Sequence, residues 1–136
     1  MSYRPESVND TIVACATADG AGAVAIVRLS GPQAIEISKK LAPSSKPRAS
    51  HRLGRATVQK PCGAVLDDAM VVHMVGPRSY TGQDSVEFHL HGSKAIVQAV
   101  IAEAKKLGAR LAGPGEFTLR AFLNGRLDLA QAEAVG

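Results

Sequence analysis

The clearest pattern along the chain is an alternation of apolar and polar residues over positions 85–91. Its apolar positions are Val86, Phe88 and Leu90, and its polar positions are Glu87, His89 and His91. Because successive side chains of a strand point to opposite faces, this pattern predicts a strand with one face in the core. The opposite face presents titratable groups.

Other segments predict further elements by composition and spacing. Runs of β-branched and small apolar residues predict strands at residues 11–17, 23–29, 53–59 and 69–75. Apolar residues at helical spacing predict helices from Ser30–Gln33 towards Pro43, from Ser93 to Leu107, over 116–123 and over 129–135. This mixture predicts an α+β domain with a mixed β-sheet flanked by helices.

Several local signals refine these elements. Ser30 is expected to cap the first helix, and Gly108 to end the second in a left-handed conformation. Asp67 and Asp68 are expected to form a turn, which aspartate favours. A catalytic carboxylate pair is the disfavoured alternative, because adjacent side chains of an extended chain point to opposite faces. The expected core-facing helical residues are Ile96, Val100, Ala104 and Leu107, then Phe117, Phe122 and Leu123.

The composition is typical of one globular domain. The chain has 136 residues, 46% hydrophobic and 21% charged, which excludes collagen-like, disordered and coiled-coil classes. No apolar run approaches the ~20 residues of a membrane-spanning helix, and no secretory signal opens the chain. Cys15 and Cys62 are far apart, which excludes a Cys-x-x-Cys zinc or redox motif but leaves a single disulfide open. We therefore expect a soluble cytoplasmic domain.

The net charge of +4 is unevenly distributed. One stretch without any acidic residue carries Lys39, Lys40, Lys46, Arg48, Arg52, Arg55 and Lys60. Such a stretch can attract nucleic-acid phosphates, but no aromatic residues are interleaved with it to stack bases. A solvated surface segment is the favoured interpretation.

Motifs for nucleotide and hydrolase chemistry are weak or missing. Residues 20–25 match a loose G-x-G-x-x-A pattern, but a predicted strand follows them where dinucleotide binding requires a helix. A tight connection between strands is favoured there. The sequence contains neither a G-x-x-x-x-G-K-[ST] loop nor a G-x-S-x-G elbow.

The polar face of the 85–91 strand is the candidate for chemistry. Metal binding by Glu87, His89 and His91 is disfavoured, because ligands at alternate positions spread over ~13 Å of extended chain. The carboxylate of Glu87 is better suited to two ring N–H donors of a flat heterocycle. Arg28 lies in an apolar strand and needs a carboxylate from protein or ligand, and Arg126 follows a turn. For both arginines an ordinary structural ion pair is the alternative.

Four motifs carry a resemblance that covers residue 10 to the end. They read D-T-I-V-A at 10–14, G-A-V-A-I-V-R-L-S-G at 22–31, Y-T-G-Q-D-S-V-E-F-H-L-H-G at 80–92 and P-G-E-F-T-L-R-A-F-L-N-G-R-L-D-L-A-Q-A-E-A at 114–134. In this order and spacing they resemble the N-terminal domain of the MnmE/TrmE family of tRNA modification GTPases.

The resemblance implies a fold similar to the folate-binding domain of aminomethyltransferases and a homodimer. It implies binding of a tetrahydrofolate derivative such as 5-formyltetrahydrofolate through Arg28, Glu87 and Arg126, with Glu87 on the pterin edge. No catalytic or metal-binding residue is expected. The expected organisation is a flexible lead-in at 1–9, the folate-binding and dimerisation domain at 10–125, and the start of a truncated central helical domain at 126–136.

Three positions depart from the usual pattern of this family. Gln83 stands where Glu is usual, Ser93 where Gly is usual, and Arg126 where Lys is common. Arginine keeps the positive charge but donates its hydrogen bonds in a planar fork.

For the full-length protein, the resemblance implies a potassium-dependent GTPase that binds GTP and Mg²⁺ outside these residues. With an FAD-dependent partner it would install a carboxymethylaminomethyl group on the wobble uridine of tRNA. Two alternatives stay open: a stand-alone aminomethyltransferase-like folate protein, and a tRNA-binding module that uses the basic 39–60 segment.

Overall fold

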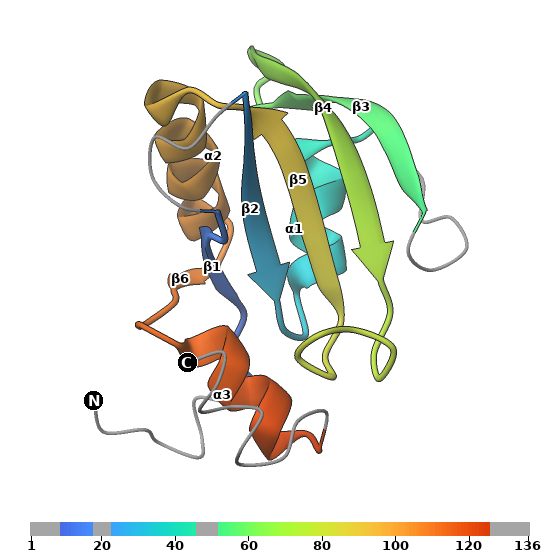
Figure 1. Ribbon diagram of the computed structural model, residues 1–136. Coiled ribbons are helices and arrows are strands. Elements are labelled where there is room, and N and C mark those ends of the chain that lie inside the picture. The colour runs from blue at the N-terminus through green and yellow to red at the C-terminus, as the bar shows by residue number, and fades with distance from the viewer. Residues whose placement is uncertain (1–8, 18–22, 46–51, 126–136) are drawn as a thin grey trace.

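The computed structural model describes residues 9–17, 23–45 and 52–125. In chain order these form β1 (Ile12–Cys15), β2 (Val24–Ser30), α1 (Ala34–Leu41), β3 (Leu53–Gln59), β4 (Val65–Met74), β5 (Ser85–His91), α2 (Lys94–Lys106), β6 (Arg110–Leu111) and α3 (Glu116–Leu123). The strands form one sheet in the order β3-β4-β5-β2-β1-β6 (Figure 1). β1 and β6 pair in parallel and all other neighbours are antiparallel, so the predicted mixed sheet of an α+β fold is confirmed.

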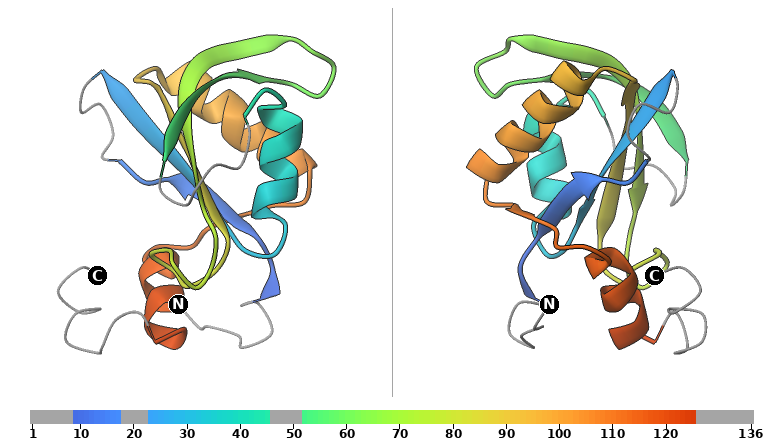
Figure 2. Two further views of the ribbon diagram at one scale, coloured as in Figure 1. Left: turned by 90° about the vertical axis from the view of Figure 1, so that its right-hand side faces the viewer. Right: turned by 60° about the vertical axis from the view of Figure 1, so that its left-hand side comes forward.

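Helices α1 and α2 cover one face of the sheet, and α3 lies at its lower end (Figures 1 and 2). The sheet residues of the core include Val13, Val27, Leu29, Val58, Val71, Val86, Phe88 and Leu90. The helices add Ala34, Ile37, Leu41, Val97, Val100 and Ala104. None of the described helices covers the upper part of the opposite sheet face, and that face carries the polar side chains of β5. None of the described helices is long and apolar enough to cross a membrane.

The structure confirms the prediction for β5, with identical bounds. Val86, Phe88 and Leu90 are at most 1% exposed, because β5 is a central strand with its apolar face against the helices. Across the other face, the pairing register places Glu87 opposite Arg28 on β2.

The expected turn at Asp67 and Asp68 is wrong, because both residues lie within β4. The chain reverses earlier, where the backbone N–H of Gly63 donates to the carbonyl of Lys60 at 2.8 Å. Asp67 accepts hydrogen bonds from the backbone N–H of His91 at 2.9 Å, and its Oδ1 lies 2.8 Å from Nδ1 of that histidine. His91 on the neighbouring strand β5 therefore stabilises Asp67 within β4. The turn preference of aspartate reflects only its neighbours in sequence and does not include such a contact.

The predicted cap at Ser30 is also wrong. Ser30 is the last residue of β2, and α1 begins four residues later at Ala34. Between them, Gly31 has a φ of +139°, and a Cβ there would lie 2.6 Å from the Cα of Thr11. The backbone N–H of Gln33 donates to the hydroxyl of Thr11 at 2.8 Å, so a side chain from another segment replaces the local cap.

The start and end of α2 follow the prediction more closely. The Ser93 hydroxyl accepts the backbone N–H of Ile96 as an N-cap, and Gly108 has a φ of +116° after the last turn. Of the expected inward stripe, Val100 and Ala104 are fully buried, whereas Ile96 and Leu107 are half-buried at the border of the core.

In α3 the expected apolar anchors are only partly correct. Phe117 and Phe122 are half-buried, whereas Leu123 is 47% exposed. The buried face of α3 instead consists of Glu116, Arg120 and Ala121, because it packs against polar groups at the end of the sheet. Helix 129–135, the lead-in up to residue 8 and the segment 126–136 lie outside the described residues. β6 was not predicted, and two residues are too few to produce a period.

Candidate functional site

An ion pair links the two central strands on the polar face of the sheet. Nε of Arg28 on β2 donates to Oε2 of Glu87 on β5 at 2.9 Å. Their side chains are 21% and 15% exposed, so the pair is shielded but can be reached from solvent. The carboxylate partner predicted for Arg28 is therefore confirmed, and it comes from the protein itself.

Two aromatic rings lie against the guanidinium group of Arg28. Its Cζ is 5.4 Å from the ring centroid of Tyr80 and 5.2 Å from that of Phe117, both within cation–π range. Tyr80 belongs to the segment between β4 and β5, and Phe117 to the first turn of α3. The hydroxyls of Tyr80 and Thr118 lie 2.9 Å apart, which joins these two elements directly. The result is a charged pair bordered by flat rings, which we call the Arg28–Glu87 cluster.

The second carboxylate oxygen of Glu87 is also engaged. Nε2 of His89 lies 3.1 Å from Oε1, so both oxygens of Glu87 have partners within the protein. His91, the third polar residue of β5, turns to Asp67 instead. Among the described residues, no group of three or more His, Cys, Asp or Glu side chains could hold a metal ion.

The structure brings together two of the three predicted ligand contacts. Arg28 and Glu87 are paired, whereas Arg126 lies outside the described residues. Sequence reasoning missed Tyr80 and Phe117 as neighbours of Arg28, because Phe117 was assigned to the core. The available signal was that Tyr80 and Phe117 lie in two of the motifs that carry the resemblance.

A buried charged network lies next to this cluster, at the base of α3. Arg120 is fully buried and donates to Oδ1 of Asp10 at 2.5 Å and to Oε2 of Glu116 at 3.2 Å. Arg110 donates to the same two carboxylates, with its Nη2 at 2.7 Å from Oε2 of Glu116 and its Nε at 2.7 Å from Oδ2 of Asp10. Two arginines and two carboxylates therefore fix α3 to the residues just before β1 and to β6.

The arginines shift the titration of both carboxyl groups. Hydrogen bonds from Arg110, and secondarily from Arg120, hold the pKa of Asp10 below its usual value. Burial favours the neutral form of Glu116, but the hydrogen bonds from Arg110 and from the Gly113 N–H outweigh it, and the pKa is lowered.

The network should make the protein sensitive to acid. A carboxyl group whose pKa is lower in the folded state stabilises the fold above its unfolded pKa of about 4, and this stabilisation is lost as the pH falls through the folded pKa. Between about pH 4 and pH 2, the wild type should lose about 1 kcal/mol more unfolding free energy than Asp10→Asn, a value discounted for the partial exposure of Asp10. Urea unfolding at several pH values measures this, and parallel pH profiles for the two proteins would contradict it.

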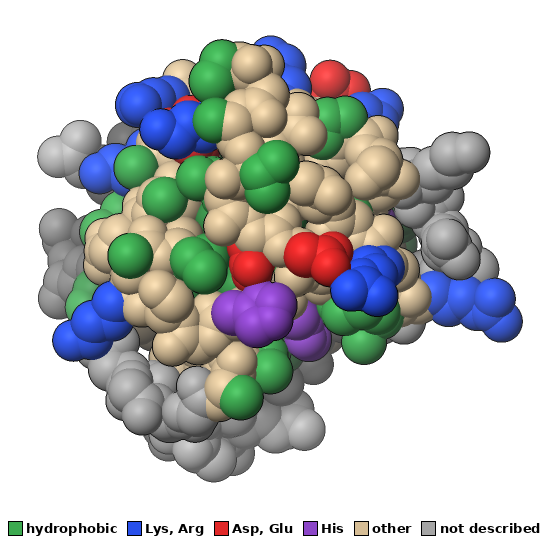
Figure 3. Space-filling model, turned by 90° about the horizontal axis from the view of Figure 1, so that it is seen from above, with side chains coloured by type: hydrophobic (Ala, Val, Ile, Leu, Met, Phe, Trp, Pro, Cys, Tyr) green, Lys and Arg blue, Asp and Glu red, His purple; other side chains and the backbone are tan. Residues whose placement is uncertain are grey.

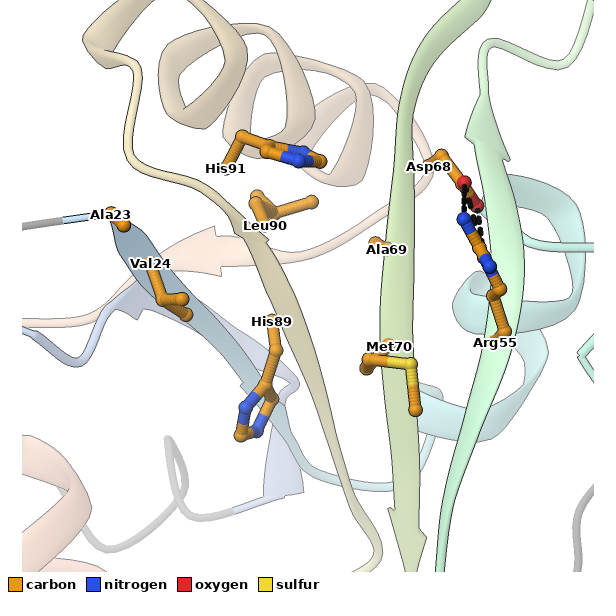
Figure 4. Close-up of a pocket in the computed structure, with 9 residues that line it drawn as sticks. All are labelled: Ala23, Val24, Arg55, Asp68, Ala69, Met70, His89, Leu90 and His91. Atoms are coloured by element: carbon orange, nitrogen blue, oxygen red, sulfur yellow. Dashed lines mark hydrogen bonds and ion pairs between the residues drawn. The ribbon is translucent and has the colours of Figure 1, made fainter.

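A shallow hollow of about 270 Å³ lies on the same sheet face, above the Arg28–Glu87 cluster. It is lined by Ala23, Val24, Arg55, Asp68, Ala69, Met70, His89, Leu90 and His91 (Figure 4). From above, histidine, acidic and basic side chains lie close together on this part of the surface, next to apolar ones (Figure 3). His89 lines the hollow and also contacts Glu87, so a ligand in the hollow would approach Glu87.

The basic segment has acidic partners elsewhere in the chain. Arg55 on β3 donates to Asp68 on β4 at 2.7 Å, and Lys39 on α1 lies 3.4 Å from Glu36. Hydrogen bonding with Arg55 lowers the pKa of the exposed Asp68 carboxyl. These pairs reduce the positive charge that the segment offers to nucleic acid.

Comparison with known proteins agrees with the motifs. The family model described as GTP-binding protein TrmE N-terminus matches residues 11–126. The chain is 53% identical over 128 residues to the tRNA modification GTPase MnmE of Caulobacter vibrioides, covering 94% of the chain and 28% of that protein. It is 48% identical over 135 residues to the probable tRNA modification GTPase MnmE of Cyanidioschyzon merolae, covering 99% of the chain and 30% of that protein.

The chain thus spans less than a third of the length of these relatives. The family match covers most of the chain, and it includes β2, β5 and α3, the elements that carry the Arg28–Glu87 cluster and its two rings. The chain therefore belongs to the TrmE N-terminal family, the N-terminal domain of the tRNA modification GTPase MnmE.

Proposed function

We propose that this domain binds a reduced folate that carries a one-carbon unit, such as 5-formyltetrahydrofolate, at the Arg28–Glu87 cluster. The observation that carries the proposal is the shielded Arg28–Glu87 pair bordered by the rings of Tyr80 and Phe117. A carboxylate beside flat aromatic surfaces fits a flat heterocycle with adjacent N–H donors.

Each part of a folate would find a complementary group in this site. The two oxygens of Glu87 would accept hydrogen bonds from the edge of the pterin ring. To do so, Oε1 would exchange its contact with His89 for a donor of the ligand. Arg28, hydrogen-bonded to Glu87, would lie at the pterin end of the ligand, and Arg126 would attract the negatively charged glutamate tail at the other end.

For the longer protein, we propose the tRNA modification and GTP hydrolysis that its relatives' names state, together with the cofactors, partner and product that the family resemblance implies. It would hydrolyse GTP with Mg²⁺ and K⁺ outside these residues, and with an FAD-dependent partner it would install a carboxymethylaminomethyl group on the wobble uridine of tRNA. This domain would hold the folate and form a cytoplasmic homodimer. The family match favours this proposal over a stand-alone aminomethyltransferase-like protein.

Calorimetric titration of the 136-residue chain with 5-formyltetrahydrofolate tests the proposal. We expect saturable binding of one ligand per chain. A matched compound, p-aminobenzoylglutamate, has the acidic tail but no pterin, and it should bind far more weakly because it cannot occupy Glu87. No heat with the folate, or equal affinity for both compounds, would contradict the proposal.

A further inference from the structure

The buried guanidinium group of Arg120 connects chain segments that are far apart in sequence. Its Nη1 donates to the backbone oxygen of Asp10 at 2.6 Å and to Oε1 of Gln83 at 3.0 Å. Its Nη2 donates to the carboxylates of Asp10 and Glu116. One fully buried side chain of α3 therefore joins the residues just before β1 to the segment that leads into β5.

Gln83 extends this network to the strand that carries Arg28. The hydroxyl of Ser30 donates to Oε1 of Gln83 at 3.0 Å and lies 2.7 Å from Oγ1 of Thr81. Ser30 is two residues after Arg28 on β2, so the two side chains share a face of the sheet. The hydrogen bonds of Arg120 thus reach the sheet face on which the Arg28–Glu87 cluster lies.

The two elements that this network joins carry the two aromatic rings. Phe117 lies three residues before Arg120 on α3, and Tyr80 lies three residues before Gln83. The ring centroids lie 5.4 Å and 5.2 Å from Cζ of Arg28, and Tyr80 and Phe117 belong to two elements other than β2. Their contacts with Arg28 therefore depend on the position of each element against the sheet. A shift of α3 would move Phe117 away from Arg28.

We propose that Arg120 is a positioning residue, which holds α3 and the segment before β5 so that Phe117 and Tyr80 border Arg28. The guanidinium group has a planar fork of donors, and here it has acceptors on three segments, so it sets orientation as well as distance. That the positioned rings serve a ligand site rests on the proposed function. The position of the rings can be measured without any folate.

The first test substitutes Gln83, at the edge of the network, and leaves the buried Arg120 unchanged. Gln83→Met removes the acceptor at similar size, and Gln83→Glu keeps an oxygen acceptor for Arg120 and Ser30. The readout is the NMR signal of the Arg28 Nε–H group, which has a hydrogen bond to Glu87 and two nearby rings that shift its resonance. We expect this signal to move in Gln83→Met and to stay close to its wild-type position in Gln83→Glu, while the backbone amides of β2 and β5 are unchanged.

Arg120→Lys provides the second test, because lysine keeps the charge but not the fork of donors. The Arg28 signal should move in this variant too. In both Gln83→Met and Arg120→Lys, affinity for 5-formyltetrahydrofolate should fall about tenfold, as expected for a misplaced binding group.

The outcomes separate this inference from the proposed function. An unchanged Arg28 signal in both folded variants overturns the positioning role, and so does loss of the whole folded spectrum in both, which would show a purely structural role. If the wild type binds no folate, the proposed function fails, and the Arg28 signal still decides whether Arg120 positions the rings.

Discussion

Replacing Glu87 with alanine should weaken the binding of 5-formyltetrahydrofolate about 100-fold in calorimetric titration. The substitution removes both acceptor oxygens for the pterin edge and leaves the shielded guanidinium group of Arg28 without its carboxylate. A 100-fold loss of affinity corresponds to about 2.7 kcal/mol. Hydrogen bonds between a charged carboxylate and a ligand are worth about 1.5–3 kcal/mol each, so the loss of those from Glu87 accounts for it. Circular dichroism at the titration temperature verifies that the variant is folded.

Two variants serve as controls for this prediction. Glu87→Gln keeps the shape and one acceptor oxygen, so its affinity should lie between those of wild type and Glu87→Ala. His89→Ala removes the internal competitor 3.1 Å from Oε1 of Glu87, so it should bind the folate at least as tightly as the wild type. Unchanged affinity in Glu87→Ala would show that this carboxylate does not contact the ligand.

Phe88→Ala should lower the free energy of unfolding by about 3–5 kcal/mol, the usual cost of removing a buried phenylalanine side chain. Phe88 is 0% exposed and lies on central strand β5, whose inner face packs against α1 and α2. The cavity left behind cannot collapse easily, because backbone pairing with both β2 and β4 holds the strand in place. Equilibrium urea unfolding measures the loss.

Leu123→Ala is the matched control, since sequence reasoning placed Phe88 and Leu123 alike in the core. Leu123 is 47% exposed, so its truncation should cost no more than about 0.5 kcal/mol. Comparable losses in the two variants would mean that Leu123 is buried in solution and would contradict its exposure in the structure.

A strand could be predicted from the sequence wherever its apolar and polar residues alternate along its whole length. In β5 the alternation of Val86, Phe88 and Leu90 with polar residues predicted both the strand and the face that lies in the core. The prediction that Arg28 needs a carboxylate was correct for a similar reason, since a charge among apolar neighbours requires a partner. The partner itself could not be chosen, because it depends on which strands are neighbours in the sheet.

The errors occur where distant residues compete with a local preference. Asp67 favours turns, but the backbone N–H of His91, 24 residues away, binds its carboxylate within β4. Ser30 is a good helix cap by type, but its hydroxyl contacts Thr81 and Gln83. In both cases a hydrogen bond from another segment replaced the local one that the residue type suggests.

The candidate site shows the same division. The motif residues alone indicated the family and selected Arg28 and Glu87, because residue type and period-2 spacing are properties of a short segment. The rings of Tyr80 and Phe117 and the buried network of Arg120 came from the folded chain only. Asp10 and Arg120 are 110 residues apart, and a hydrogen bond across that separation depends on how the intervening strands and helices pack, which no local pattern encodes.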